Sequence, residues 1–220
     1  MGIGLNLAFV VVEAVYGVLA HSMALLADAG HNLSDVLALT LAWGASTLAR
    51  REPSERFTYG LRSSSILAAL LNAALLLVVT GGIAWEAINR FAAPAPVAGE
   101  TVIWVALVGI LVNGASAMLF ARDRRRDVNM RGAFLHLAAD AAVSLGVVVA
   151  GMGILFTGWL WLDPLTGLVI AVAIVWSTWG LLRDSVALAL NAVPEHIDPR
   201  VVRTYLWCSS PRCTTCTSGR

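Results

Sequence analysis

The sequence predicts an all-α membrane protein with six transmembrane helices. Of its 220 residues, 58% are hydrophobic and only 13% are charged. A soluble domain carries roughly 25% charged and about 45–50% apolar residues. Six long apolar stretches run along the chain, and arginines cluster in two of the loops between them. All the basic residues are arginine, and this clustering indicates membrane topology and no nucleic-acid binding.

Each apolar stretch is close to the ~20 residues needed to cross ~30 Å of hydrocarbon. The stretches are about Gly2 to Leu19, Met23 to Leu48, Ser64 to Ile88, Thr101 to Phe120, Ala133 to Phe156 and Leu160 to Leu182. Only Ala20-His21-Ser22 joins the first two, which predicts a tight antiparallel hairpin. The first stretch has neither a basic segment before it nor a small-residue cleavage site, so we expect a retained span.

Arginine asymmetry orients the predicted bundle. The arginines of the connections after the second and fourth stretches are Arg50, Arg51, Arg56 and Arg62, and Arg122, Arg124, Arg125, Arg126 and Arg131. The connections on the opposite side hold only Arg90. By the positive-inside rule both Arg-rich loops are cytoplasmic, and six spans then place both termini in the cytoplasm.

The start of the sixth stretch and the C-terminal segment differ in composition from the apolar spans. Asp163-Pro164 suits a helix N-cap followed by proline at the first helical position, so structure explains Asp163 and we leave it out of the candidate site. Residues 191–203 predict a short linker and the start of an amphipathic helix. Residues 207–220 lack apolar periodicity and are rich in Cys, Thr and Ser, so no folded domain is expected there.

Two matched motifs carry the chemistry of this sequence. His31 and Asp35 lie in the second stretch, and His136 and Asp140 lie in the fifth. The spacing of four residues places each histidine and aspartate on one helix face. Ionisable residues inside a bilayer are costly and usually line an interior pathway or site. Together the pairs offer two nitrogens and two oxygens, which predicts a buried site for a divalent cation.

The ligand types favour zinc. Imidazole with carboxylate suits four-coordinate Zn²⁺, whereas a purely carboxylate set favours harder ions such as Mg²⁺ or Mn²⁺. The alternative for each pair is a His–Asp hydrogen bond that joins neighbouring helices, but two pairs of identical spacing favour the metal. Cys213-Thr-Thr-Cys216, with Cys208 nearby, offers three thiols and no folded frame, so we expect no metal site in the tail.

Two further acidic residues have supporting roles. Asp28 shares a helical stripe with His31 and Asp35, and is a fifth ligand, an acceptor that orients His31, or a carboxylate in an aqueous entrance; the last two are favoured. Glu13 either lines the same polar cavity or bonds a neighbouring helix. Glu86 and Arg90 predict a structural ion pair.

At these residues the chain resembles a known family. LLADAGHNLSDVLALTLAWGA, RFTYGLRSSSILAALLNAALLLVVTGGIAWEAINRF, AFLHLAADAAVSLGVVVAG and WLDPLTGLVIAVAIVWSTWGLLRDSVALALNAVPEHID are similar to the cation diffusion facilitators, and closest to their bacterial cobalt–zinc–cadmium resistance branch. The resemblance covers roughly residues 1–206.

The resemblance implies a function and a site. It implies a secondary transporter, not an enzyme, in the bacterial inner membrane that exports Zn²⁺, with Co²⁺ or Cd²⁺ also carried, in exchange for protons. Its transport site is His31, Asp35, His136 and Asp140. The implied partners are the metal cation, protons, the lipid bilayer and a second copy in a homodimer; no prosthetic cofactor is implied.

The sequence departs from the family after Tyr205-Leu206, where most members continue into a cytoplasmic α/β domain. We therefore expect a transport domain at 1–185, a linker and the start of a truncated cytoplasmic domain at 186–206, and an unstructured, aberrant tail at 207–220. A shifted reading frame is one hypothesis for this tail, and loss of the α/β domain weakens the dimer. The alternatives are a metal-binding but transport-inactive remnant and, less favoured, an intramembrane metal-dependent hydrolase.

Overall fold

The computed structural model describes residues 2–51, 61, 63–121, 127–193 and 197–208, and these contain α-helices and no strand. The helices are α1 (Gly2–Leu19), α2 (Met23–Ala49), α3 (Ser64–Ala92), α4 (Gly99–Ala121), α5 (Val128–Thr157), α6 (Leu162–Ala189) and α7 (Pro199–Cys208). The first six match the six apolar stretches. Most extend a few residues further, because helical turns continue past the point where the sequence stops being apolar.

The turn between α1 and α2 forms the tight hairpin that the sequence predicts. His21 has a φ of 53°, a left-handed conformation that lets the chain reverse within a few residues. Ser22 then caps α2, because its hydroxyl oxygen accepts a hydrogen bond from the Leu25 amide at 3.2 Å. This hairpin fixes how the polar residues of α1 and α2 face each other.

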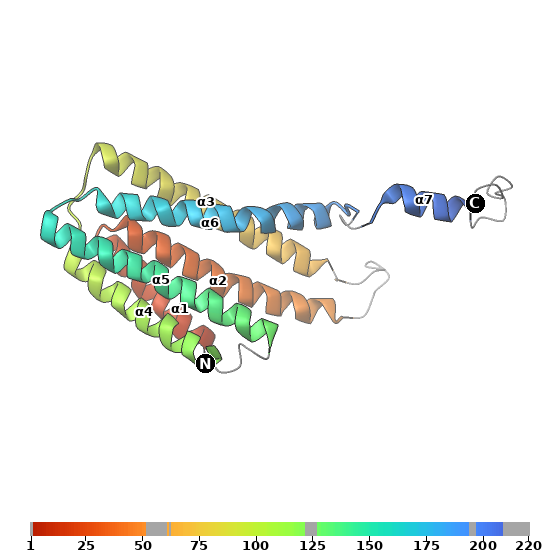
Figure 1. Ribbon diagram of the computed structural model, residues 1–220, viewed down its shortest axis with the longest axis horizontal. Helices are drawn as coiled ribbons and strands as arrows, with labels where there is room; N and C mark the ends of the chain where they lie inside the picture. The colour runs from red at the N-terminus through yellow and green to blue at the C-terminus, as the bar shows by residue number, and fades with distance from the viewer. Residues whose placement is uncertain (1, 52–60, 62, 122–126, 194–196, 209–220) are drawn as a thin grey trace.

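Figure 1 shows α1, α2, α4 and α5 lying side by side, while α3 and α6 run together across one face. α4 packs along α5, and α2 contacts α1, α3 and α6. Close approach depends on small residues, as is usual between membrane helices. A Cβ on Gly167 of α6 would lie 2.9 Å from backbone atoms of Met23. Only glycine lets these two helices meet there.

The outer surface is that of a membrane protein. Large apolar side chains point outward on every long helix, among them Trp43, Val78, Leu119, Phe156 and Trp176. Among the described residues, α3, α4, α6 and the Met130–Thr157 part of α5 are long and apolar enough to span a bilayer. The corresponding part of α1 is shorter, and polar residues interrupt α2.

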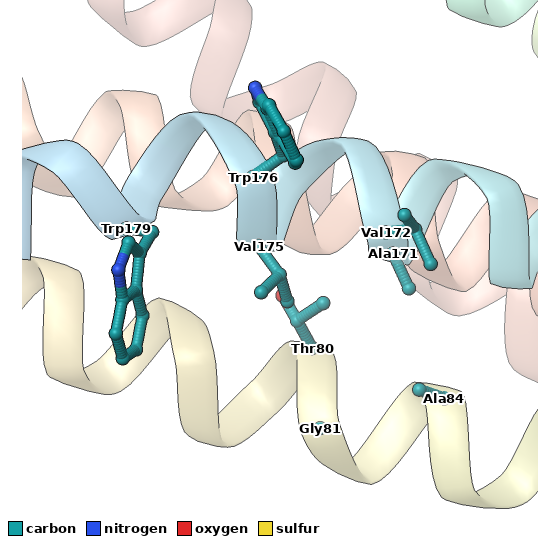
Figure 2. Close-up of a pocket in the computed structure, with 8 residues that line it drawn as sticks. All are labelled: Thr80, Gly81, Ala84, Ala171, Val172, Val175, Trp176 and Trp179. Atoms are coloured by element: carbon teal, nitrogen blue, oxygen red, sulfur yellow. The ribbon is translucent and has the colours of Figure 1, made fainter.

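An apolar groove opens between α3 and α6 (Figure 2). Thr80 and Ala84 line it from α3, and Val175 and Trp179 line it from α6, while Trp176 points away from α3. None of its lining residues is ionisable. The groove therefore offers no ionisable group to bind a metal cation.

α7 begins after the bundle ends and projects beyond α6 (Figure 1). Its described side chains are exposed along residues 199–207. The helix reaches Cys208 and so includes the first two residues of the expected tail. The remaining tail, and most of both Arg-rich loops at 52–60, 62 and 122–126, lie outside the described residues, as does His196.

Candidate metal centre

The two His–Asp motifs lie on α2 and α5 and face each other. Within α2, His31 Nε2 lies 3.8 Å from Asp35 Oδ2. Within α5, His136 Nε2 lies 3.7 Å from Asp140 Oδ2. Each motif is therefore a compact donor pair on one helical turn, as its spacing predicts.

The contacts across the two helices are shorter still. His31 Nε2 lies 3.4 Å from Asp140 Oδ1, and His136 Nε2 lies 3.2 Å from Asp35 Oδ2. The two imidazole rings have centroids 6.2 Å apart and stand at 80° to each other. Nitrogen and oxygen donors thus alternate around one point between α2 and α5.

These separations suit a tetrahedral cation. Zinc bonds of ~2.0–2.2 Å place neighbouring donors of a tetrahedron about 3.3–3.6 Å apart. The four nitrogen-to-oxygen distances, from 3.2 to 3.8 Å, bracket that span. Donor atoms of His31, Asp35 and Asp140 all lie within 4.8 Å of one another. His136 is not part of this group of three, but its Nε2 lies 3.2 Å from Asp35 Oδ2.

The four side chains differ in how far they are buried, so the site is more accessible on one side than on the other. The Asp140 side chain is 6% exposed, whereas that of His136 is 49% exposed. His31 and Asp35 lie between these extremes. His31 Nδ1 is buried and has no hydrogen-bond partner. The centre is therefore closed on the Asp140 side and open at His136.

Glu13 and Asp28 lie deeper than the four donors. Both are fully buried. Ser144 donates a hydrogen bond to Asp28 at 2.9 Å, and Asn32 donates one to Glu13 at 3.0 Å. Asp28 makes no hydrogen bond to His31. The part these two residues play in transport stays a prediction.

Sequence reasoning missed that Glu13 and Asp28 pair with each other. The short turn of the α1–α2 hairpin could have predicted this contact. Glu13 lies eight residues before His21 and Asp28 seven after it, so an antiparallel hairpin that reverses at His21 brings them side by side.

Asp163 does not cap its own helix. The N-cap of α6 is Trp161, so the expected N-cap role was wrong. The Asp163 carboxylate instead accepts hydrogen bonds from Ser22 Oγ at 2.5 Å and from the amides of Met23 and Ala24 at 2.6 and 3.3 Å. Those amides begin α2, where a helix leaves its first N–H groups unpaired. Asp163 is structural, as expected, but it caps a different helix.

Glu86, Arg90 and Asn72 have structural partners. Arg90 and Glu86 form the expected ion pair at 3.2 Å, and Arg90 also donates to the backbone carbonyl of His21. Asn72 Nδ2 donates to Ser34 Oγ at 3.3 Å, which joins α3 to α2. These groups position helices and do not add ligands to the centre.

Comparison with known proteins gives a consistent result. A family model described as the cation efflux transmembrane domain matches residues 1–188. The chain is 37% identical over 199 residues to the cadmium, cobalt and zinc/H(+)-K(+) antiporter of Bacillus subtilis (strain 168), covering 89% of this chain and 64% of that protein. It is 40% identical over 196 residues to the zinc transporter ZitB of Escherichia coli (strain K12), covering 89% and 63%.

A third relative is the cation efflux system protein CzcD of Alcaligenes sp. (strain CT14). It is 33% identical over 198 residues, which cover 90% of this chain and 63% of the relative. The chain thus spans less than two thirds of the length of the curated relatives it matches.

Proposed function

Since the chain belongs to the cation efflux family, we propose that it exports divalent metal cations, zinc foremost, in exchange for protons. The observation that carries this proposal is the alternation of His31, Asp140, His136 and Asp35 donors at 3.2 to 3.8 Å between α2 and α5. Its relatives are named as transporters of zinc, or of cadmium, cobalt and zinc. Cobalt and cadmium are therefore further candidate substrates.

We propose His31, Asp35, His136 and Asp140 as the metal ligands. Two ionised carboxylates balance the two positive charges of the cation, so the loaded centre has no net charge. This matters because an uncompensated charge inside a bilayer is expensive. Two imidazole nitrogens add the ligand type that suits zinc better than magnesium or calcium.

Proton exchange follows from ligand chemistry. A metal takes neutral imidazole and ionised carboxylate, so binding displaces protons held by the empty centre. In the empty centre each histidine faces an aspartate of the other helix, an arrangement that accommodates a proton between them. Export then requires the centre to open alternately to the two sides, by rocking of helix groups around a fixed site.

We also propose that residues 1–185 are the transport domain. Residues 1–185 contain all four proposed ligands, helices α1 to α5 and all of α6 except its last four residues, so they form the transport unit. We also propose a homodimer. Crosslinking in native membranes tests this, and a chain that migrates only as a monomer would contradict it.

Zinc flux into proteoliposomes tests the function. The full chain is reconstituted, a pH gradient is imposed and labelled zinc uptake is measured. Asp35→Asn and His136→Gln should each abolish proton-driven uptake. The matched controls are Asp184→Asn, in an exposed position of α6, and His21→Asn, in the hairpin turn, and both should transport normally. Undiminished flux in both ligand variants would refute the assignment.

The same preparation separates transport from binding. A wild-type chain that binds zinc in detergent but shows no gradient-driven uptake would be a metal-binding protein without transport activity. A chain that neither binds nor transports zinc would contradict the proposed function altogether.

A further inference from the structure

The membrane interior holds a second acidic pair besides the proposed metal ligands. Glu13 on α1 and Asp28 on α2 are both fully buried, and the α1–α2 hairpin brings their carboxyl groups close enough to interact. Two ionised carboxylates buried side by side repel each other. A single proton shared by the two groups would relieve this repulsion and leave one negative charge on the pair.

The donors around the pair leave a defined place for that proton. Asn32 donates to Glu13 Oε2 and Ser144 donates to Asp28 Oδ2. The other oxygen of each carboxyl group, Glu13 Oε1 and Asp28 Oδ1, is buried and has no protein donor. A single proton between the two groups satisfies both oxygens.

Among the described residues, the one basic group that acts on the pair is His31, which is itself a proposed metal ligand. The charged groups that act on Asp28, apart from Glu13, are His31 and Asp140, and only Asp28 acts on Glu13. The neighbouring helices α1 and α4 carry no basic residue. Two like charges held together in a buried site repel each other strongly. The pair therefore retains its proton unless a new cation arrives.

The metal centre is where such a cation would arrive. Asp28 lies three residues before His31 on α2, and Ser144 lies four residues after Asp140 on α5. Side chains at these spacings on a helix are about 5–6 Å apart. The pair and its donors thus form a layer directly next to the proposed ligands on both helices.

A glycine on α4 keeps this layer assembled. A Cβ on Gly109 would lie 2.9 Å from Phe9 Cζ and 3.0 Å from Ser144 Oγ. Because Gly109 lacks that carbon, the Ser144 hydroxyl fits between α4 and α2 and reaches Asp28. The hydrogen bond to Asp28 therefore depends on three helices and not on a loop.

We propose that Glu13 and Asp28 form a proton-binding site separate from the metal centre, and that a divalent cation bound at the metal centre expels this proton. The coupling rests on the proposed function. In this step one O–H bond breaks, the proton passes to water, and the pair changes from one negative charge to two. The nearby divalent charge stabilises the second carboxylate, with Asn32 and Ser144 still donating to the pair.

Two measurements on the purified full chain in detergent test the proposal. Infrared spectroscopy of the metal-free protein should show the C=O band of a protonated carboxyl group. Zinc titration in weak buffer, followed with a pH indicator, counts the protons released per bound ion. The variants are Glu13→Gln and Asp28→Asn, and the control is Glu86→Gln, whose side chain is 52% exposed.

Both variants should lose the infrared band and release about one proton fewer per bound zinc ion than the wild type, because the shared proton is gone before metal arrives. Glu86→Gln should match the wild type in both. Circular dichroism and gel filtration check that the variants fold. Because either substitution alone tests the pair, the experiment remains decisive if one of the two variants does not fold.

Other results would overturn the proposal. Equal proton release in wild type and variants would show that the pair keeps its proton or holds none. Proton release that changes when choline replaces sodium or potassium would assign the pair to a monovalent cation instead. A wild-type chain that binds no zinc would refute the proposed function and the coupling, while the infrared band would still decide whether the pair holds a proton.

Discussion

His136 Nε2 lies 3.2 Å from Asp35 Oδ2 on the opposite helix, closer than it lies to Asp140 in its own motif, at 3.7 Å. His31 shows the same preference for Asp140 over Asp35. Neither motif therefore forms a complete site alone. The donor set exists only while α2 and α5 keep their relative position, so a movement of one helix past the other would open or close it.

Replacing one imidazole should change which metal the centre prefers. His31→Asp converts the donor set to one nitrogen and three carboxylates, which suits harder ions. We expect the ratio of zinc to manganese affinity to fall by about tenfold, or 1.4 kcal/mol. Competition titrations in detergent measure the ratio, with His21→Asp in the hairpin turn as the control. An unchanged ratio would show that His31 is not a ligand.

Zinc binding should weaken as the pH falls. The metal needs neutral imidazole and ionised carboxylate, so acid favours the empty, protonated centre. For each proton displaced, affinity should decrease by up to about tenfold per pH unit below the titration of the ligands. Equilibrium titrations between about pH 6 and 8 test this. A pH-independent affinity would contradict proton exchange at the centre.

The sequence predicts the helices well because each is a long apolar run, and it predicts the four donors because their spacing is local. It does not predict which residues of different helices contact each other. Asp163 looks like the cap of α6 because Pro164 follows it, yet it accepts a hydrogen bond from Ser22, which is 141 residues away. Helix pairing of this kind leaves no periodic signal. The α1–α2 hairpin is an exception, because its short turn indicates that Glu13 and Asp28 approach each other, although the sequence analysis did not predict this contact.

Asp163 should be a major determinant of stability. Its carboxylate accepts three hydrogen bonds at the start of α2, and a substituted amide would turn an NH₂ group toward one of these donors. Asp163→Asn should cost about 1–3 kcal/mol. Ser22→Ala removes one of these donors and also the hydroxyl that accepts from the Leu25 amide, so it should cost about 0.5–2 kcal/mol. Thermal unfolding in detergent measures both, and Asp184→Asn serves as the exposed control. Equal transition temperatures for Asp163→Asn and Asp184→Asn would contradict this role.

Removing α7 should leave the helical bundle intact. Its described side chains are exposed, and it shares no extensive contact with α1 to α6. A chain ending at Ala192 should therefore keep its zinc affinity and its unfolding temperature in detergent. A clear drop in either would show that the segment after Ala192 supports the bundle.

Gly167 should be the most sensitive small residue of the α2–α6 contact. A Cβ at this position would lie 2.9 Å from the Met23 carbonyl carbon and oxygen, and backbone atoms cannot move aside as a flexible side chain does. Gly167→Ala should therefore separate the two helices and destabilise the protein by about 1–3 kcal/mol. Gly180→Ala on the same helix has no atom within 4 Å of the new Cβ. It should be neutral, or stabilising by up to about 1 kcal/mol, because alanine favours the helix more than glycine does. Thermal unfolding of the two variants side by side measures the difference. If both unfold at the wild-type temperature, α2 and α6 are not packed as closely as the Gly167–Met23 contact requires.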